Sequence, residues 1–146
     1  MLFRWNTIGT VFNDKSITTF PELNHFVNVK TLMFKRGGSI NELGVRNITT
    51  AGMQCLSDTH ITKPLVFDNL AACQAHAFNS MTTVSAMIIR SNVVPTVGGT
   101  PLFGDNFKID AIYVPDDLVD AYKAATGWST KASIIFPLSD CPYDYN

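Results

Sequence analysis

One apolar pattern recurs along this chain and limits its fold more than any other feature. Apolar residues occupy a first position and then the positions six, nine and eleven residues later. The copies are Leu23, Val29, Leu32, Phe34; Leu56, Thr62, Leu65, Phe67; Phe78, Val84, Met87, Ile89; and Phe103, Ile109, Ile112, Val114, with one failure at Thr62, beside Ile61. Their starts are 33, 22 and 25 residues apart. Self-similarity at such a spacing indicates stacked repeats.

Each copy closes on a short alternating run, which is typical of a half-buried strand. The runs are TLMF, PLVF, AMII and AIYV. Segments 50–61 and 71–84, ahead of two of these runs, are rich in small residues and end in a polar turn. The shorter spacings are those of leucine-rich solenoids, in which each unit supplies one parallel strand and a loose return. The longer first interval predicts an insertion, for which the Gly pair and polar residues of 35–44 are suited.

We therefore expect an α/β fold, namely a short leucine-rich-repeat solenoid of about four parallel strands with irregular or helical returns and a C-terminal capping helix. One repeat cannot bury its own apolar face, so several must stack and both ends need caps. Phe78 and Phe103 would form an internal column, with Cys55 and Ala77 as small residues nearby. The predicted divisions are an N-terminal arm or cap at 1–16, the solenoid at 17–115, a C-terminal cap at 116–137 and a tail at 138–146.

The stretch AIYVPDDLVDAYKAATGW (111–128) predicts how the stack ends. Ile112 and Val114 would be the last rung of the solenoid, and Pro115 would end the strand. The acids that follow are Asp116, Asp117 and Asp120. A carboxylate pair for acid–base work or a cation site is one interpretation. The other, which we favour, is that acids complement the dipole at the start of a helix and that an Asp caps its free amides.

The helix of this stretch has one apolar face. Leu118, Tyr122 and Ala125, at i, i+4 and i+7, would lie over the open end of the stack. Gly127 stands where a left-handed helix end is expected, and Trp128 is placed to close the edge. The stretch thus predicts a cap.

Composition narrows the functional classes. The 146 residues suggest one domain; 46% are hydrophobic and 16% charged, with a net charge of −1. The densest basic cluster is FKRGG, so the phosphate-neutralising face of a nucleic-acid-binding protein is not expected. No apolar run approaches the roughly 18 residues of a membrane span. Polar residues interrupt MLFRWNTIGTVFNDK, which therefore does not resemble a secretory signal, and we expect a soluble product or fragment.

Metal chemistry has little support in the sequence. The cysteines are Cys55, Cys73 and Cys141, and their odd number argues against a disulfide framework. Cys55-x4-His60 and Cys73-x2-His76 look superficially like zinc pairs, but zinc requires four ligands, usually from closely spaced pairs. Cys55 falls at the repeat position of Ala77, a core position. We therefore expect free core thiols, no metal and no other cofactor.

Catalytic motifs are equally weak. Asp58 and His60 lie near Ser57 and Ser80, the residue types of a hydrolase triad, but nothing around them resembles a nucleophile elbow. The Gly pairs of RGGS and VGGT lack the Lys and the helix of a phosphate loop, and they predict turns. We expect no catalytic residues and no enzyme activity.

Several motifs resemble the BspA-type leucine-rich-repeat family. AHAFNSMTTVSAMII (75–89) looks like its repeat, in which an Ala-Phe pair begins the return and a strand follows. AIYVPDDLVDAYKAATGWST (111–130) resembles the closing segment of those proteins, and VVPTVGGTPLFGD (93–105) their penultimate repeat. ITTFPELNHFVNVKTL (17–32) is similar to an opening repeat. The resemblance covers roughly 17–137, and the second repeat departs from the usual Ala-Phe motif.

The resemblance implies a function in contact rather than in chemistry. Such proteins are similar to surface adhesins of gut and oral Bacteroidales and to modules in virion proteins of their tailed phages, including crAss-like phages. It implies a non-enzymatic virion protein, such as a head or tail fibre or a capsid decoration protein, assembled in the host cytoplasm. Its partners would be other virion proteins or a host-surface receptor, and a homo-oligomer such as a trimer is plausible. The alternative is a ligand-binding adhesin module on a bacterial cell surface.

Both ends of the chain carry residues that need partners. The arm at 1–16 has the apolar residues Leu2, Phe3, Trp5, Ile8, Val11 and Phe12. They would cap the first repeat or pack on another virion protein. The tail DCPYDYN (140–146) is either a disordered terminus or docks Tyr143 and Tyr145 on a neighbouring chain.

Overall fold

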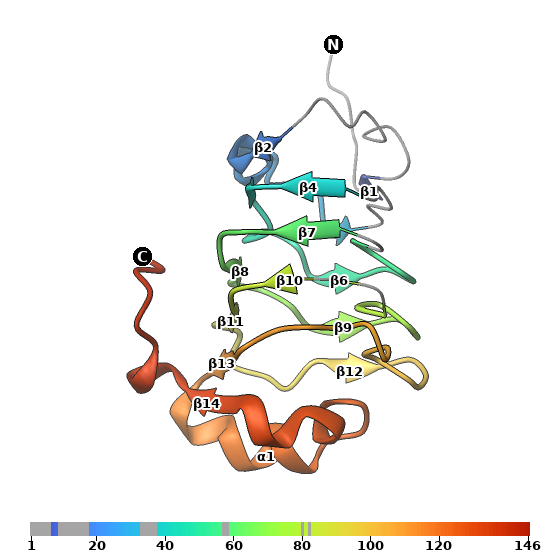
Figure 1. Ribbon diagram of the computed structural model, residues 1–146, viewed down its shortest axis with the longest axis vertical. Helices are drawn as coiled ribbons and strands as arrows, with labels where there is room; N and C mark the ends of the chain where they lie inside the picture. Colours follow the sequence, from blue (N-terminus) through green and yellow to red (C-terminus); the bar gives the residue numbers. More distant parts are fainter. Residues whose placement is uncertain (1–6, 9–17, 33–37, 57–58, 80, 82) are drawn as a thin grey trace.

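The fold is mixed α/β, with parallel sheets and few helices. The computed structural model describes residues 7–8, 18–32, 38–56, 59–79, 81 and 83–146 (Figure 1). The strands are β1 (Thr7–Ile8), β2 (Thr19–Phe20), β3 (Thr31–Leu32), β4 (Gly38–Ile40), β5 (Glu42–Leu43), β6 (Thr50–Ala51), β7 (Thr59–Ile61), β8 (Leu65–Phe67), β9 (Ala72–Cys73), β10 (Thr83–Val84), β11 (Met87–Ile89), β12 (Thr96–Val97), β13 (Ile112–Val114) and β14 (Ile135–Pro137). The helical elements are α1 (Val119–Ala124) and the 3₁₀ segments η2 (Pro21–His25), η3 (Asp116–Leu118), η4 (Trp128–Ile134) and η5 (Leu138–Asp140).

All pairings between the described strands are parallel, and the strands form four sheets. The orders are β1-β3-β6-β9-β12, β10-β7-β4, β14-β13-β11-β8 and β2-β5. The chain visits the three larger sheets in turn, first through β6, β7 and β8 and then through β9, β10 and β11. In Figure 1 the strands lie one above another along the long axis, and α1 crosses one end of the stack. Apolar side chains from the sheets meet in one core between them.

The predicted apolar columns are confirmed in the C-terminal half. Phe78 forms a parallel bridge with Phe103, and their rings stack with centroids 5.8 Å apart. Met87 pairs with Ile112 in the next column. Cys55 and Ala77, the expected small residues, are fully buried. Residues 22 to 25 apart therefore do occupy equivalent positions in this part of the chain.

The second copy of the pattern needs a correction of one residue. Ile61, and not Thr62, pairs with Val84 and is fully buried. Thr62 is exposed and its hydroxyl donates to the carbonyl oxygen of Asn41 at 3.1 Å. Further along, Leu65 pairs with Met87 as predicted. The fixed spacing failed because the return before β7 is one residue shorter than that before β10.

The first copy does not lie in the same sheet as the later copies. Leu32 lies in β3, pairs with Ala51 and belongs to the five-stranded sheet, whereas Leu65 lies in the four-stranded one. The insertion was predicted at 35–44, of which 35–37 lie outside the described residues. Its remaining part contains β4 and β5, and Ile40 pairs with Ile61. Each pass of the chain buries apolar residues on three sides, so an apolar match alone does not say which sheet a strand joins. Phe34 lies outside the described residues.

The burial predicted for the stretch at 111–128 is confirmed for its two large aromatic residues. Tyr122 and Trp128 are fully buried, and the Trp128 indole N–H donates to the carbonyl oxygen of Pro95 at 3.0 Å. Leu118 and Ala125 pack against the core. However, β13 is not the last strand, because the chain returns after η4 and β14 pairs with β13 (Figure 1).

Backbone details at the cap differ from the expected helix signals. Gly127 has the predicted positive φ, +82°, and begins η4 against Leu102 and Val97. The acids occupy first turns as predicted, but no Asp side chain caps η3 or α1. Asp116 instead accepts the backbone N–H of Ser139 at 3.0 Å, and hydrogen bonds from Ser139 lower the pKa of the Asp116 carboxyl. None of the described helices has the length and apolar character to cross a membrane.

Of the predicted N-terminal arm, only β1 is described. It pairs with β3 at the edge of the five-stranded sheet, with Thr7 opposite Thr31 and Ile8 opposite Leu32. This backbone pairing agrees with a capping role for that strand. The contacts expected of Leu2, Phe3, Trp5, Val11 and Phe12 lie outside the described residues.

Candidate functional site: an outer sheet face and the C-terminal tail

An apolar row crosses the outer face of the four-stranded sheet. Val66, Ile88, Tyr113 and Phe136 are directly opposite one another on β8, β11, β13 and β14. Side chains alternate along a strand, so the neighbours of these residues point into the core and the row points outward. A solvated sheet face normally carries polar residues. An apolar row there marks a surface that needs a cover.

The C-terminal tail, residues 141–146, provides that cover within the same chain. Ile88 is fully buried although it does not belong to the core cluster. The Tyr143 ring meets the Tyr113 ring at a right-angled contact with centroids 6.5 Å apart. Figure 1 shows the tail running back along the side of β13, β11 and β8. The tail thus packs against the sheet of its own chain.

A ladder of alternating charges holds the end of the tail. Arg46, Asp68 and Arg90 follow β5, β8 and β11 at intervals of 22 residues, with ion pairs of 3.2 and 3.3 Å. The guanidinium groups of Arg46 and Arg90 both donate to the Tyr145 carbonyl oxygen, at 2.8 and 3.3 Å. Arg90 also lies 5.5 Å from the centre of the Tyr145 ring, within cation–π range.

These ion pairs orient the arginine side chains more than they stabilise the fold. The ladder side chains are 28% to 36% exposed, and pairs of that kind contribute on the order of 0–1 kcal/mol each. Asp68 pairs with both arginines and so orients their guanidinium groups. Further N–H groups of the two arginines then point at the Tyr145 carbonyl oxygen. The result is a pre-organised donor pair next to the apolar row.

The tyrosine of the row shows the effect of this cover. Burial raises the pKa of the Tyr113 phenol, and nearby Cys141, Tyr143 and Asp140 add to that rise when they are ionised. All of these groups belong to the tail or its base. Part of the rise in the Tyr113 pKa therefore has its cause in the tail and its base.

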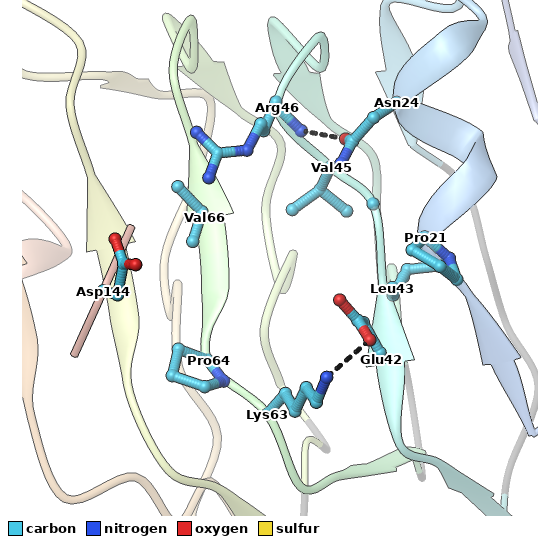
Figure 2. Close-up of a pocket in the computed structure, with 11 residues that line it drawn as sticks. Pro21, Asn24, Glu42, Leu43, Val45, Arg46, Lys63, Pro64, Val66 and Asp144 are labelled. Atoms are coloured by element: carbon cyan, nitrogen blue, oxygen red, sulfur yellow. Dashed lines mark hydrogen bonds and ion pairs between the residues drawn. The ribbon is translucent and has the colours of Figure 1, made fainter. Parts of the chain in front are cut away.

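A groove lies next to the tail, with Arg46 and Asp144 among the residues that line it (Figure 2). Its volume is about 340 Å³, and it is lined by Pro21, Asn24, Glu42, Leu43, Gly44, Val45, Arg46, Lys63, Pro64, Val66 and Asp144. Lys63 donates to Glu42 at 2.8 Å, and Asp144 of the tail forms the opposite wall from η2. Gly44 lies so close to η2 that a β-carbon would meet the side chain of Asn24 at 2.7 Å.

A second hollow, of about 440 Å³, lies beside the three-stranded sheet. It is lined by His60, Ile61, Thr62, Val84, Ser85, Lys108 and Asp110. The hydroxyl of Ser85 is buried there and has no hydrogen-bond partner among the residues that the structure describes. The mixed acid, base and hydroxyl lining fits a small polar group but forms no recognisable catalytic arrangement.

The residues weighed from the sequence as metal ligands are dispersed. Cys55 and Cys73 lie in the core, where burial raises the pKa of the Cys73 thiol to about 12 and that of Cys55 further. His60 lines the second hollow, and His76 has a positive φ of 60° in a turn. Among the described residues, no three His, Cys, Asp or Glu side chains gather closely enough to hold a metal ion.

The other residues considered as site candidates from the sequence do not form a common site among the described residues. Asp116 binds the Ser139 amide, as described above, and VGGT forms a bend after β12. Ser57, Asp58 and Ser80, weighed as triad members with His60, lie outside the described residues. The ladder residues were not predicted from the sequence. A signal for them was present, since three charged residues recur at the repeat interval. No family model matches this chain, and no curated protein matches it.

Proposed function

We propose that the chain is a short leucine-rich-repeat solenoid of the BspA type, divided as the sequence predicts, and that it works as a non-enzymatic structural and interaction protein of a tailed-phage virion. It would be a head or tail fibre or a capsid decoration protein, in contact with other virion proteins or a host-surface receptor. The parallel pairing of equivalent positions at intervals near 22 residues supports the solenoid. The closing motif at 111–130 supports the family and, through it, the virion setting.

The observation that carries an interaction role is the outer face of the four-stranded sheet. Protein contact surfaces are enriched in tyrosine, other aromatic residues and arginine. This face combines Tyr113, Phe136 and Arg90, with Phe136 38% exposed. Phe136 stays partly exposed on this face, where it can contact a protein partner without any reacting group.

Purified phage particles test the virion setting. We expect peptides of this chain to co-sediment with intact particles in a stoichiometric amount, as measured by mass spectrometry of gradient fractions. A matched gradient of an uninfected culture is the control. Recovery only from bacterial membrane or secreted fractions would exclude the virion proposal and favour the alternative, a ligand-binding adhesin module of a bacterial surface protein.

A further inference from the structure

We propose that the apolar row and its two arginines form a docking site for an acidic, tyrosine-bearing tail, and that the tail of a second copy of this chain occupies it in trans. The occupant in cis is the chain's own segment 141–146. The site consists of Val66, Ile88, Tyr113, Arg46 and Arg90. This inference is independent of the virion setting proposed above.

Aromatic, cation–π and hydrogen-bond contacts join the site and the tail. The rings of Tyr143 and Tyr145 lie on Tyr113 and on the Arg90 guanidinium, and two arginines share the Tyr145 carbonyl. The tail is acidic, with Asp140 and Asp144 close to those tyrosines in sequence. The tail is therefore a ligand whose fit to this site is visible in the structure.

The tail is attached in a way that permits exchange. After η5 it forms no regular secondary structure and pairs with no strand, and Pro142 lacks an N–H that a strand partner needs. Its described contacts are ring contacts, one cation–π contact and hydrogen bonds from partly exposed arginines. Segments held in this way open locally well below the free energy of global unfolding. Six extended residues span about 20 Å, enough to reach an adjacent copy.

Exchange between identical copies preserves every contact of the tail. What differs is concentration, because a short tether gives the cis tail an effective concentration in the millimolar range. Dilute chains therefore keep their own tails, whereas chains held side by side exchange them, as in domain swapping. The second copy is the best-supported partner, since its tail is known to fit.

Two complementary variants test the proposal. The acceptor is the chain shortened to end at Asp140, which has an open site and no tail. The donor is the full chain with Arg46→Glu and Arg90→Glu, which has a tail that its own site rejects. We expect each to be monomeric alone and the mixture to form a 1:1 complex at ~100 μM, by size-exclusion chromatography with light scattering.

The control donor carries the same arginine changes together with Tyr143→Ser and Tyr145→Ser, and it should form no complex. A full-length Tyr143→Ser, Tyr145→Ser chain is a second acceptor if the shortened chain does not fold. Absence of a complex, with donor and an acceptor both folded by circular dichroism, overturns the proposal. A complex that survives with the control donor also overturns it, because the interface then lies elsewhere.

Discussion

Removing the Trp128 side chain should destabilise the whole protein. The side chain is fully buried, contacts the rings of Phe103 and Tyr122 at 5.6 and 5.1 Å, and donates to the Pro95 carbonyl. Truncating a buried Trp to Ala costs about 3–5 kcal/mol, and the lost hydrogen bond adds about 1 kcal/mol. We expect Trp128→Ala to lower the free energy of unfolding by about 5 kcal/mol, which is comparable to the total stability of many domains.

The assay is urea and thermal denaturation followed by far-ultraviolet circular dichroism. Tryptophan fluorescence is unsuitable, because the variant removes one of the two Trp residues. For a chain of this size, 5 kcal/mol corresponds to a fall in Tm of about 10–20 °C. Loss should begin at the cap, because in stacked structures each layer is stabilised by its neighbours.

Two further variants test whether the loss of stability is specific to the buried indole at position 128. Trp128→Phe keeps a ring but loses the indole N–H, and we expect a loss of roughly 2 kcal/mol. Phe136→Ala, at a residue that is 38% exposed, should cost under about 1.5 kcal/mol. If Trp128→Ala shifted Tm by less than about 3 °C, the cap would not stabilise the stack and the reasoning would be refuted.

Three other outcomes follow from the structure. Gly44→Ala should lower stability by roughly 1–3 kcal/mol, because a β-carbon would lie only 2.7 Å from a side-chain atom of η2; an unchanged melting temperature would contradict this contact. At about pH 8, iodoacetamide should modify Cys141 alone in the folded protein and all three thiols in urea, as counted by mass spectrometry, since Cys55 and Cys73 are buried; modification of three thiols before unfolding would refute it. Burial raises the folded-state pKa of Cys55, Cys73 and Tyr122, so the unfolded chain releases these protons first, from pH near 9.0 for the two thiols and near 10.0 for the phenol. Stability should therefore be intact below the lower of these pH values and fall above it by roughly 1 kcal/mol per group per pH unit, which urea midpoints at about pH 8 and about pH 10 would show; equal midpoints would argue against burial of these groups.

The cap was predictable because its signals are local. Tyr122 and Trp128 lie within one continuous stretch, where helix spacing and a following Gly indicate a buried face and a stop. Both residues are fully buried, as expected. The return of the chain into β14 was not predicted, because pairing with β13 depends on where η4 directs the chain and not on the sequence near β13.

Register in the N-terminal half was harder to predict. Leu32 and Leu65 match one apolar template but belong to different sheets, and Ile40 was assigned to an insertion. When three sheets surround one core, nearly every second or third residue is apolar, so a sparse template fits in more than one register. Thr62 beside Ile61 was the visible sign of that ambiguity.

The candidate site depended on contacts that are distant in sequence. Arg46 and Tyr145 are separated by 99 residues, and no local pattern joins them. The tyrosines of the tail were noticed as contact residues, but their partner within the chain became evident only once β8, β11 and β13 lay side by side. The charge ladder could have been found by applying the repeat interval to polar residues as well as apolar ones.

β12 and β14, each at the edge of a sheet, carry features that limit pairing with a further strand. Exposed strand edges invite further strands and thus end-to-end growth into filaments. Here the carbonyl just before β12 is already bonded to Trp128, and β14 ends in Pro137, which has no N–H to offer. These two features leave fewer free backbone groups at this end of the molecule for an added strand to pair with.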